Sequence, residues 1–91
     1  MDDTLYHEIL GEERISKICV EGGLTPADDR IVYEFLCWKT YFRGKDSVLE
    51  RAINNTLWNN PRRRLIKKAL EMIEREFLIK IRFKIKKRGN F

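Results

Sequence analysis

Apolar residues recur at helical spacing through the middle of the chain. A first stripe consists of Ile31, Val32, Phe35, Leu36, Trp38 and Phe42. Residues three and four apart share one face of an α-helix, so this stripe predicts a core helix. Its start is marked by "TPAD", with Thr25 as N-cap, Pro26 as the first helical residue and Asp28 as the acid of a capping box. The predicted helix runs to about Arg43 and ends at Gly44.

Two further helices are predicted after this one. "DSVLE" begins the second helix, with Asp46 or Ser47 as its cap. Asn60 as N-cap and Pro61 at the first position begin the third, which we expect to cover residues 61–76. The residues that face inward from the third helix are Leu65, Ile66, Ala69, Leu70, Ile73 and Phe77.

The hydrophobic period changes from helical to alternating after residue 76. In "FLIKIRFKIK", residues 77–86, apolar and basic side chains alternate, which predicts a half-buried strand. No turn dipeptide and no second strand follow, so this strand needs another partner. The candidates are residues 14–20, residues 43–45 and the same strand of a second molecule, which would make a homodimer.

The N-terminal segment is less regular. "LYHEILG" predicts a short helix that ends at Gly11, whereas "RISKICVEGG" fits either a helix or a strand that ends at Gly22. A chain of 91 residues predicts one domain, 1–91. Within it we expect an N-terminal extension, 1–24, and a helix-turn-helix core with a C-terminal basic strand, 25–91. The predicted fold class is mostly α with a small β element (α+β).

Charge is distributed unevenly along this sequence. Residues 1–60 hold seven Lys or Arg and eleven acids, a net charge of −4. Residues 61–91 hold twelve Lys or Arg and three acids, a net charge of +9. An acidic front and a basic back indicate that one surface meets a polyanion. The structural alternative is a solvated basic tail, or the Lys- and Glu-rich surface of a heat-stable protein.

The start of the third helix holds only cations: Arg62, Arg63, Arg64, Lys67 and Lys68. A helix N-terminus carries partial positive charge, so each misplaced cation costs up to about 1 kcal/mol at low salt. Phosphates bind helix N-termini, and arginine binds them bidentately, so a nucleic-acid backbone would resolve this conflict. The alternative is a solvated face whose long stems cover the core. Asn59 and Asn60 lie where they could reach a base or a phosphate.

The segments "TPADDRIVYEFL", "DSVLERAI" and "PRRRLIKKALEMIEREFLIKIRFKIK" together resemble the winged-helix class of DNA-binding domains. The resemblance covers roughly residues 25–87 and implies three main helices with a C-terminal strand. It also implies that the third helix enters the major groove and that Arg62, Arg63, Arg64, Lys67 and Lys68 read DNA. By the same resemblance, the cations of the wing contact phosphates, namely Lys84, Lys86, Lys87 and Arg88.

The predicted function is sequence-specific binding of double-stranded DNA by a small transcriptional regulator. One alternative is a protein–protein adaptor, and another is binding of RNA or single-stranded nucleic acid. Trp38 and Trp58 are expected to be core or interface anchors. Cys19 and Cys37 match no metal-site spacing; the two could form one disulfide, but such cysteines more often lie as small buried hydrophobic residues in a reducing cytoplasm.

Catalysis is not expected, because His7 is the sole histidine and no nucleophile or phosphate-cradling motif is present. The sequence predicts no cofactor, metal or small-molecule ligand. It also predicts no membrane segment, because no apolar run is long enough to span a bilayer. The expected location is the cytoplasm, including the nucleoid.

Overall fold

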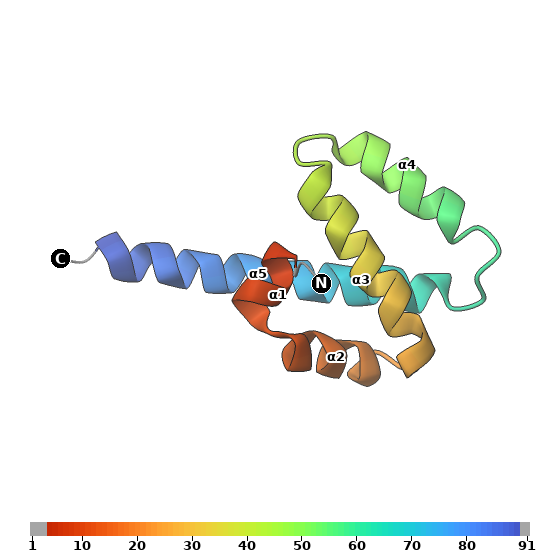
Figure 1. The fold of residues 1–91 in the computed structure, drawn as a ribbon, viewed down its shortest axis with the longest axis horizontal. Helices are drawn as coiled ribbons and strands as arrows, with labels where there is room; N and C mark the ends of the chain where they lie inside the picture. The colour runs from red at the N-terminus through yellow and green to blue at the C-terminus, as the bar shows by residue number, and fades with distance from the viewer. Residues whose placement is uncertain (1–3, 90–91) are drawn as a thin grey trace.

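The computed structural model describes residues 4–89, with side chains up to residue 86, and its described elements are all helices. In chain order they are α1 (Leu5–Leu10), α2 (Glu12–Glu21), α3 (Pro26–Tyr41), α4 (Asp46–Thr56) and α5 (Arg63–Gly89). Helices α1, α2 and α3 pack against α5, and α4 packs against α3 (Figure 1). The longest helix therefore forms the axis on which the others assemble.

Several helix ends lie where the sequence places them. Thr4 caps α1, with its Oγ1 accepting a hydrogen bond from the backbone N of His7 at 3.1 Å. Gly11 follows α1 at a φ of 87°, a conformation that glycine adopts without strain. Pro26 begins α3, and the Asp28 carboxylate accepts a hydrogen bond from the Thr25 backbone N at 3.0 Å. The predicted capping box is therefore confirmed.

The predicted C-terminal strand is wrong. Residues 77–86 continue α5 without a break, and the described residues contain no strand, so the fold is all-α and not α+β. Residues 14–20, which fitted either a helix or a strand, lie in α2. With no β partner available, a lone strand would leave its backbone groups unpaired, whereas a helix satisfies them within the segment. A homodimer through strand pairing loses its basis for the same reason.

Two helix starts differ from the prediction by a few residues. The N-cap of α4 is Lys45, so neither Asp46 nor Ser47 caps the helix. Helix α5 begins at Arg63, after a turn in which the Asn60 side-chain Oδ1 accepts a hydrogen bond from the Arg62 backbone N at 2.9 Å. Asn60 thus stabilises the turn that leads into α5, two residues before the position of an N-cap.

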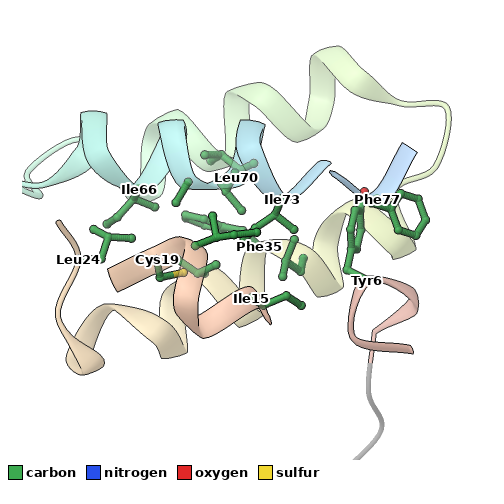
Figure 2. Close-up of a cluster of buried hydrophobic side chains, with 14 of the residues drawn as sticks. Tyr6, Ile15, Cys19, Leu24, Phe35, Ile66, Leu70, Ile73 and Phe77 are labelled. Carbon is green, nitrogen blue, oxygen red and sulfur yellow. The ribbon is translucent and has the colours of Figure 1, made fainter. Parts of the chain in front are cut away.

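The core lies between one face of α5 and the inner faces of α1, α2 and α3 (Figure 2), and Leu49, Ile53 and Leu57 add to it from α4 and its C-terminal end. Phe35 and Leu36 of α3 and Ile66 and Ile73 of α5 are completely inaccessible to solvent. The rings of Tyr6 and Phe77 lie 4.4 Å apart and attach α1 to α5. Leu65 was predicted to face this core, but its side chain is 42% exposed.

Helix α5 has two parts with different surroundings. The α5 body, residues 63–77, buries Ile66, Ala69, Leu70, Ile73 and Phe77 in the core. Most of the α5 tail, residues 78–89, extends beyond the other helices toward the C-terminus (Figure 1), although Ile81 still packs against the core. Its exposed apolar side chains are Leu78, Ile79, Phe83 and Ile85. The tail accounts for the elongated shape of the molecule, whose extents are 51 × 28 × 25 Å.

Candidate nucleic-acid interface

The solvent-exposed face of α5 carries a line of cations along both body and tail. The line consists of Arg64, Lys68, Arg75, Arg82 and Lys86, all exposed, and we call it the α5 stripe. At about 100° per residue these side chains fall within about 40° of one another around the helix axis. At 1.5 Å per residue they span about 33 Å. Helical folding thus aligns cations whose successive members are four or seven positions apart in the sequence.

Most of the α5 stripe is free to bind an external anion. Arg64, Arg75 and Arg82 make no hydrogen bond or ion pair within residues 4–86. Lys68 lies 3.9 Å from Glu71, in a pair whose side chains are both exposed. Such a surface pair contributes little to stability, so it does not explain why a lysine occupies position 68.

Among the acids of the described chain, Glu71 lies in line with the α5 stripe. It lies on the exposed face of α5 between Lys68 and Arg75, and its side chain is 72% exposed. A carboxylate at this position would repel a phosphate that binds the neighbouring cations. The local field of the stripe is therefore weakest near its middle and strongest toward its two ends.

The turn between α4 and α5 forms a shallow hollow beside Arg64. Its lining includes Trp58, Asn59, Pro61, Arg63 and Arg64. Trp58 is 72% exposed, so it is not a core residue, whereas its predicted role as an interface anchor stays a prediction. An exposed tryptophan beside arginines is typical of surfaces on which nucleic-acid bases stack. The sequence singled out Trp58 but not its exposure, for which the two asparagines that follow it were the available signal.

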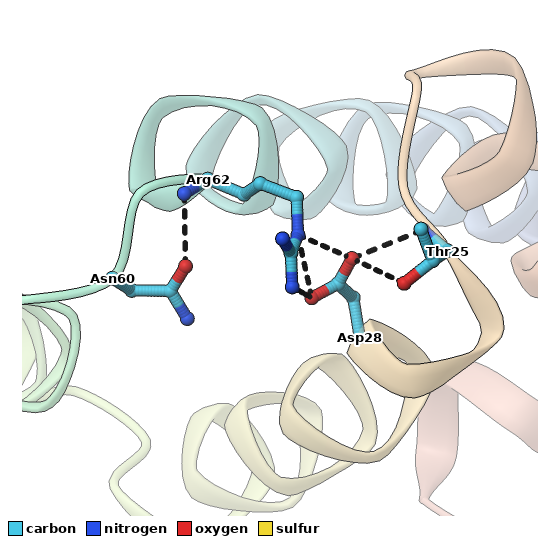
Figure 3. Close-up of polar contacts among 4 residues, drawn as sticks. All are labelled: Thr25, Asp28, Asn60 and Arg62. Atoms are coloured by element: carbon cyan, nitrogen blue, oxygen red, sulfur yellow. Dashed lines mark hydrogen bonds and ion pairs between the residues drawn. The ribbon is translucent and has the colours of Figure 1, made fainter.

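Arg62 is held within the protein. Its guanidinium forms an ion pair with Asp28, with Nε 2.8 Å from Oδ2 and Nη2 2.9 Å from Oδ1 (Figure 3). The same carboxylate accepts hydrogen bonds from the backbone N and the hydroxyl of Thr25. These donors, Arg62 foremost, lower the pKa of Asp28 to about 2. Arg62 was among the residues predicted to read DNA, but its guanidinium serves first to join α5 to α3.

The remaining residues predicted for the interface differ in their surroundings. Arg63 donates a hydrogen bond to the carbonyl of Trp58 at 3.3 Å, and Lys67 donates to Oδ1 of Asn54 at 2.7 Å. Both are exposed and lie beside the stripe on the α4 side. Asn59 is exposed in the turn, whereas Asn60 is half-buried and bonded to the Arg62 backbone.

The basic residues predicted to form a wing lie instead on the α5 tail. Lys86 belongs to the α5 stripe, whereas Lys84 lies on the opposite side of the helix, because two residues are about 200° apart. The side chains of Lys87 and Arg88 lie outside the described part of the chain. The structure therefore places these cations on a helix that is continuous with the predicted recognition helix.

No group of three or more His, Cys, Asp or Glu side chains in the described chain is arranged to hold a metal ion. Cys19 is a buried free thiol and Cys37 a half-buried one. Burial raises the pKa of Cys19 to about 11, so this thiol is poorly ionised near neutral pH.

Comparisons with models of protein families, with curated proteins and with solved structures find no match to this chain. None of the helices formed by residues 4–89 has the length and apolar character required to span a bilayer.

Proposed function

We propose that this protein binds double-stranded DNA through the α5 stripe and acts as a small transcriptional regulator. The observation that carries the proposal is the alignment of five exposed cations on one face of a single helix. Folding of the chain does not require this alignment, because like charges on one face repel one another. A linear polyanion removes that repulsion along the whole length of the stripe.

The dimensions of the stripe favour a duplex. The major groove of B-DNA is wide enough to admit an α-helix, and the stripe, about 33 Å long, can contact both the groove and the phosphates beside it. A straight helix cannot follow the curving groove over a full turn. We therefore assign the body cations Arg64 and Lys68 to the groove, and the tail cations Arg82 and Lys86 to phosphates where α5 leaves it.

Sequence preference requires groups that read base edges. Arginine recognises guanine and asparagine recognises adenine in the major groove. Arg64 and Asn59 line the same hollow at the start of α5, and both are exposed. These two residues are the candidates for base contacts, whereas the remaining cations of the stripe supply affinity that does not depend on sequence.

A salt titration of duplex binding tests the proposal. If the four cations of the stripe other than Arg64 contact phosphates, the plot of log Kobs against log salt has a slope of about −3.6. Arg64→Ala with Lys68→Ala should reduce the magnitude of that slope by about 1, through the phosphate contact of Lys68, and should weaken the preference for the bound sequence, through the base contact of Arg64. Glu71→Gln should tighten binding, because it removes the acid beside the stripe. Fluorescence anisotropy of a labelled duplex gives these affinities.

The matched control is Lys17→Ala with Lys45→Ala, which removes the same charge from α2 and from the turn before α4. Both lysines are exposed and lie outside α5. This variant should retain most of the affinity, since the field of the stripe is unchanged. Absence of duplex binding at low salt, or equal losses in the two double variants, would refute the proposal.

The exposure of Trp58 favours a second candidate, the binding of single-stranded nucleic acid. Base stacking on an aromatic side chain contributes about 1–3 kcal/mol per base and requires an unpaired base. Competition between a duplex and its separate strands distinguishes the two candidates. Trp58→Ala should leave duplex affinity nearly unchanged if DNA is bound through the stripe. It should weaken binding of a single strand by tenfold or more if bases stack on the indole.

A further inference from the structure

A groove with an acidic rim lies between α2 and α3, beside His7 of α1. Its volume is about 480 Å³. Ile15 and Val32 contribute apolar surface to its floor, whereas Glu12 and Glu34 are exposed at its rim. This volume lies within the range of about 300–1,000 Å³ found for sites that hold a compact ligand, so the groove has room for large apolar side chains.

The charges around this groove favour a cationic occupant. Three acids line it, Glu12, Asp29 and Glu34, against the single cation Arg30. Asp29 also has a buried carboxylate oxygen, Oδ1, without a hydrogen-bond partner in the described structure. Buried polar atoms are almost always hydrogen-bonded, so this oxygen is a position at which an external donor would be stabilising.

The α5 tail has the complementary properties. Ile79 and Phe83 lie one turn apart on the same side of the helix and are 56% and 73% exposed. Lys80 flanks them on one side and Lys86 on the other. No acid follows Glu76 in the sequence. The tail thus presents an apolar ridge with basic edges, the form in which an amphipathic helix binds to a groove.

The tail and the groove of one molecule cannot meet. Helix α5 is continuous from Arg63 to Gly89, and its tail extends away from α2 and α3 (Figure 1). Two tails are also poor partners for each other. Residues 78–88 hold six cations and no acid, so pairing two tails would bring twelve like charges together. The remaining arrangement joins the tail of one molecule to the groove of another.

We propose that this protein associates head to tail, with the α5 tail of one copy docked in the α2–α3 groove of a second copy. Phe83 is the central anchor in the groove, and Ile79 lies beside it. Lys80 and Lys86 face the acids at the rim. Each copy carries both surfaces, so the contact is heterologous and can be repeated from one copy to the next.

This association uses one member of the α5 stripe, Lys86, and leaves the other four exposed for DNA. The ridge of Ile79 and Phe83 lies about 60° from the centre of the stripe around the helix axis. A docked tail can therefore keep Arg82 directed toward solvent. The contact stands on the groove and the tail alone, so it holds whether or not the protein binds DNA.

Sedimentation velocity of the full chain, free of nucleic acid and at low ionic strength, tests the proposal. The wild type should form larger species as its concentration rises, and added salt should dissociate them. Ile79→Ala with Phe83→Ala, the tail variant, should remain monomeric. Glu12→Lys with Glu34→Lys, the groove variant, should also remain monomeric. All four residues are exposed, so both variants should keep the helix content of the wild type.

An equimolar mixture of the two variants is the decisive sample. The intact tail of the groove variant can dock in the intact groove of the tail variant, so the mixture should form dimers and nothing larger. A tail-to-tail contact predicts instead that the groove variant associates alone and that mixing adds nothing. That result, or a wild type that is monomeric at every concentration, would overturn the proposal.

Matched controls separate this contact from general effects of charge and hydrophobicity. Ile85→Ala removes an equally exposed apolar side chain from the other side of the tail and should not change the association. Glu21→Lys with Glu50→Lys makes the same change in charge outside the groove and should also preserve it. Loss of association in either control would contradict docking through the ridge and the groove.

Discussion

Asp28 joins the start of α3 to the start of α5 through one buried carboxylate. Its oxygens accept hydrogen bonds from Thr25, which precedes α3, and from Arg62, which precedes α5. The Arg62 guanidinium is the main reason that the pKa of Asp28 falls from 3.8 to about 2. A lowered pKa in the folded state means that the charged carboxylate stabilises the fold.

Asp28→Asn should lower the free energy of unfolding at neutral pH by about 1.5–3 kcal/mol, the range for hydrogen bonds to a charged group. The contribution of the carboxylate is complete above the unfolded pKa of 3.8 and is lost as the pH falls through about 2. The difference between wild type and variant should therefore narrow below pH 3.8. Urea unfolding at several pH values measures it.

Asp46→Asn is the control for this substitution, because Asp46 is an exposed acid in the first turn of α4. It should change the unfolding free energy by less than about 1 kcal/mol, the usual limit for an exposed charge near a helix N-terminus. If the effect of Asp28→Asn is the same at pH 2 and pH 7, the loss arises from packing and not from the charge.

The Arg62–Asp28 pair also shows what sequence reasoning could not reach at the scale of a residue. The two residues are 34 positions apart, and neither helical nor strand periodicity relates them. Local rules identified Asp28 correctly as a capping-box acid and Arg62 as a cation at an unfavourable helix end. The ion pair between Asp28 and Arg62 forms only because α3 and α5 cross at this point, which is a property of the tertiary fold.

At the scale of an element, the two parts of α5 should respond differently to the same substitution. Ile73→Ala removes a completely buried side chain from the α5 body and should cost about 2–5 kcal/mol. Ile85→Ala removes an exposed side chain from the tail and should change stability by less than about 0.5 kcal/mol. Chemical denaturation followed by circular dichroism measures both. A large loss for Ile85→Ala would place the tail within the core.

The tail is also where the predicted fold was wrong, and the reason is physical. Residues 79–86 alternate strictly between apolar and basic, which is the pattern of a half-buried strand. The same residues also place Ile79 and Phe83, and Ile81 and Ile85, at helical spacing. No Gly or Pro interrupts the chain between Pro61 and Gly89, so α5 continues by adding one backbone hydrogen bond per residue.

The interface could be predicted only in part. The sequence identified the basic start of α5 and the basic C-terminal segment as separate groups, one on a helix and one on a wing. The alignment of Arg64, Lys68 and Arg75 with Arg82 and Lys86 follows only when both segments form one helix. Arg75 was not selected, because acids surround it in the sequence. In the structure it lies in the middle of the α5 stripe.

At the scale of the whole molecule, charges of opposite sign occupy different sides of the fold. Cations line the exposed face of α5, whereas acids rim the groove between α2 and α3. The two proposals use these two sides, DNA at the stripe and a neighbouring copy at the groove. Repetition of the head-to-tail contact would join several stripes in one assembly, and DNA affinity and self-association should reinforce each other if those stripes meet one duplex.

The pH dependence of stability reflects groups throughout the molecule. On the acid side, hydrogen bonds from Arg62 and Arg14 lower the pKa values of Asp28 and Glu76, so the Glu76 contribution is lost as the pH falls below about 4.5 and the Asp28 contribution as it falls below about 3.8. Burial and the nearby Asp28 raise the pKa of Asp29, which has the opposite sign and offsets part of this loss. Stability should therefore fall less steeply with decreasing pH than Asp28 and Glu76 alone would cause.

On the alkaline side, burial raises the pKa of Cys19 from 9.0 to about 11 and that of Tyr6 from 10.0 to about 12. A pKa raised by folding stabilises the protein below the unfolded value, and this contribution is lost as the pH rises to the folded value. The melting temperature should thus be highest between about pH 5 and 8 and should fall above pH 9.

Tyr6→Phe tests the alkaline limb, because it keeps the ring that packs on Phe77 and removes the ionisable hydroxyl. Thermal melts in reducing buffer should show a smaller loss between pH 10 and 12 for this variant than for the wild type. Tyr41→Phe is the control, because Tyr41 is 84% exposed. Removal of its hydroxyl should not change the fall of the melting temperature between pH 10 and 12. If the melting temperature falls equally with pH in all three proteins, ionisation of the buried Tyr6 hydroxyl does not contribute to the alkaline loss of stability.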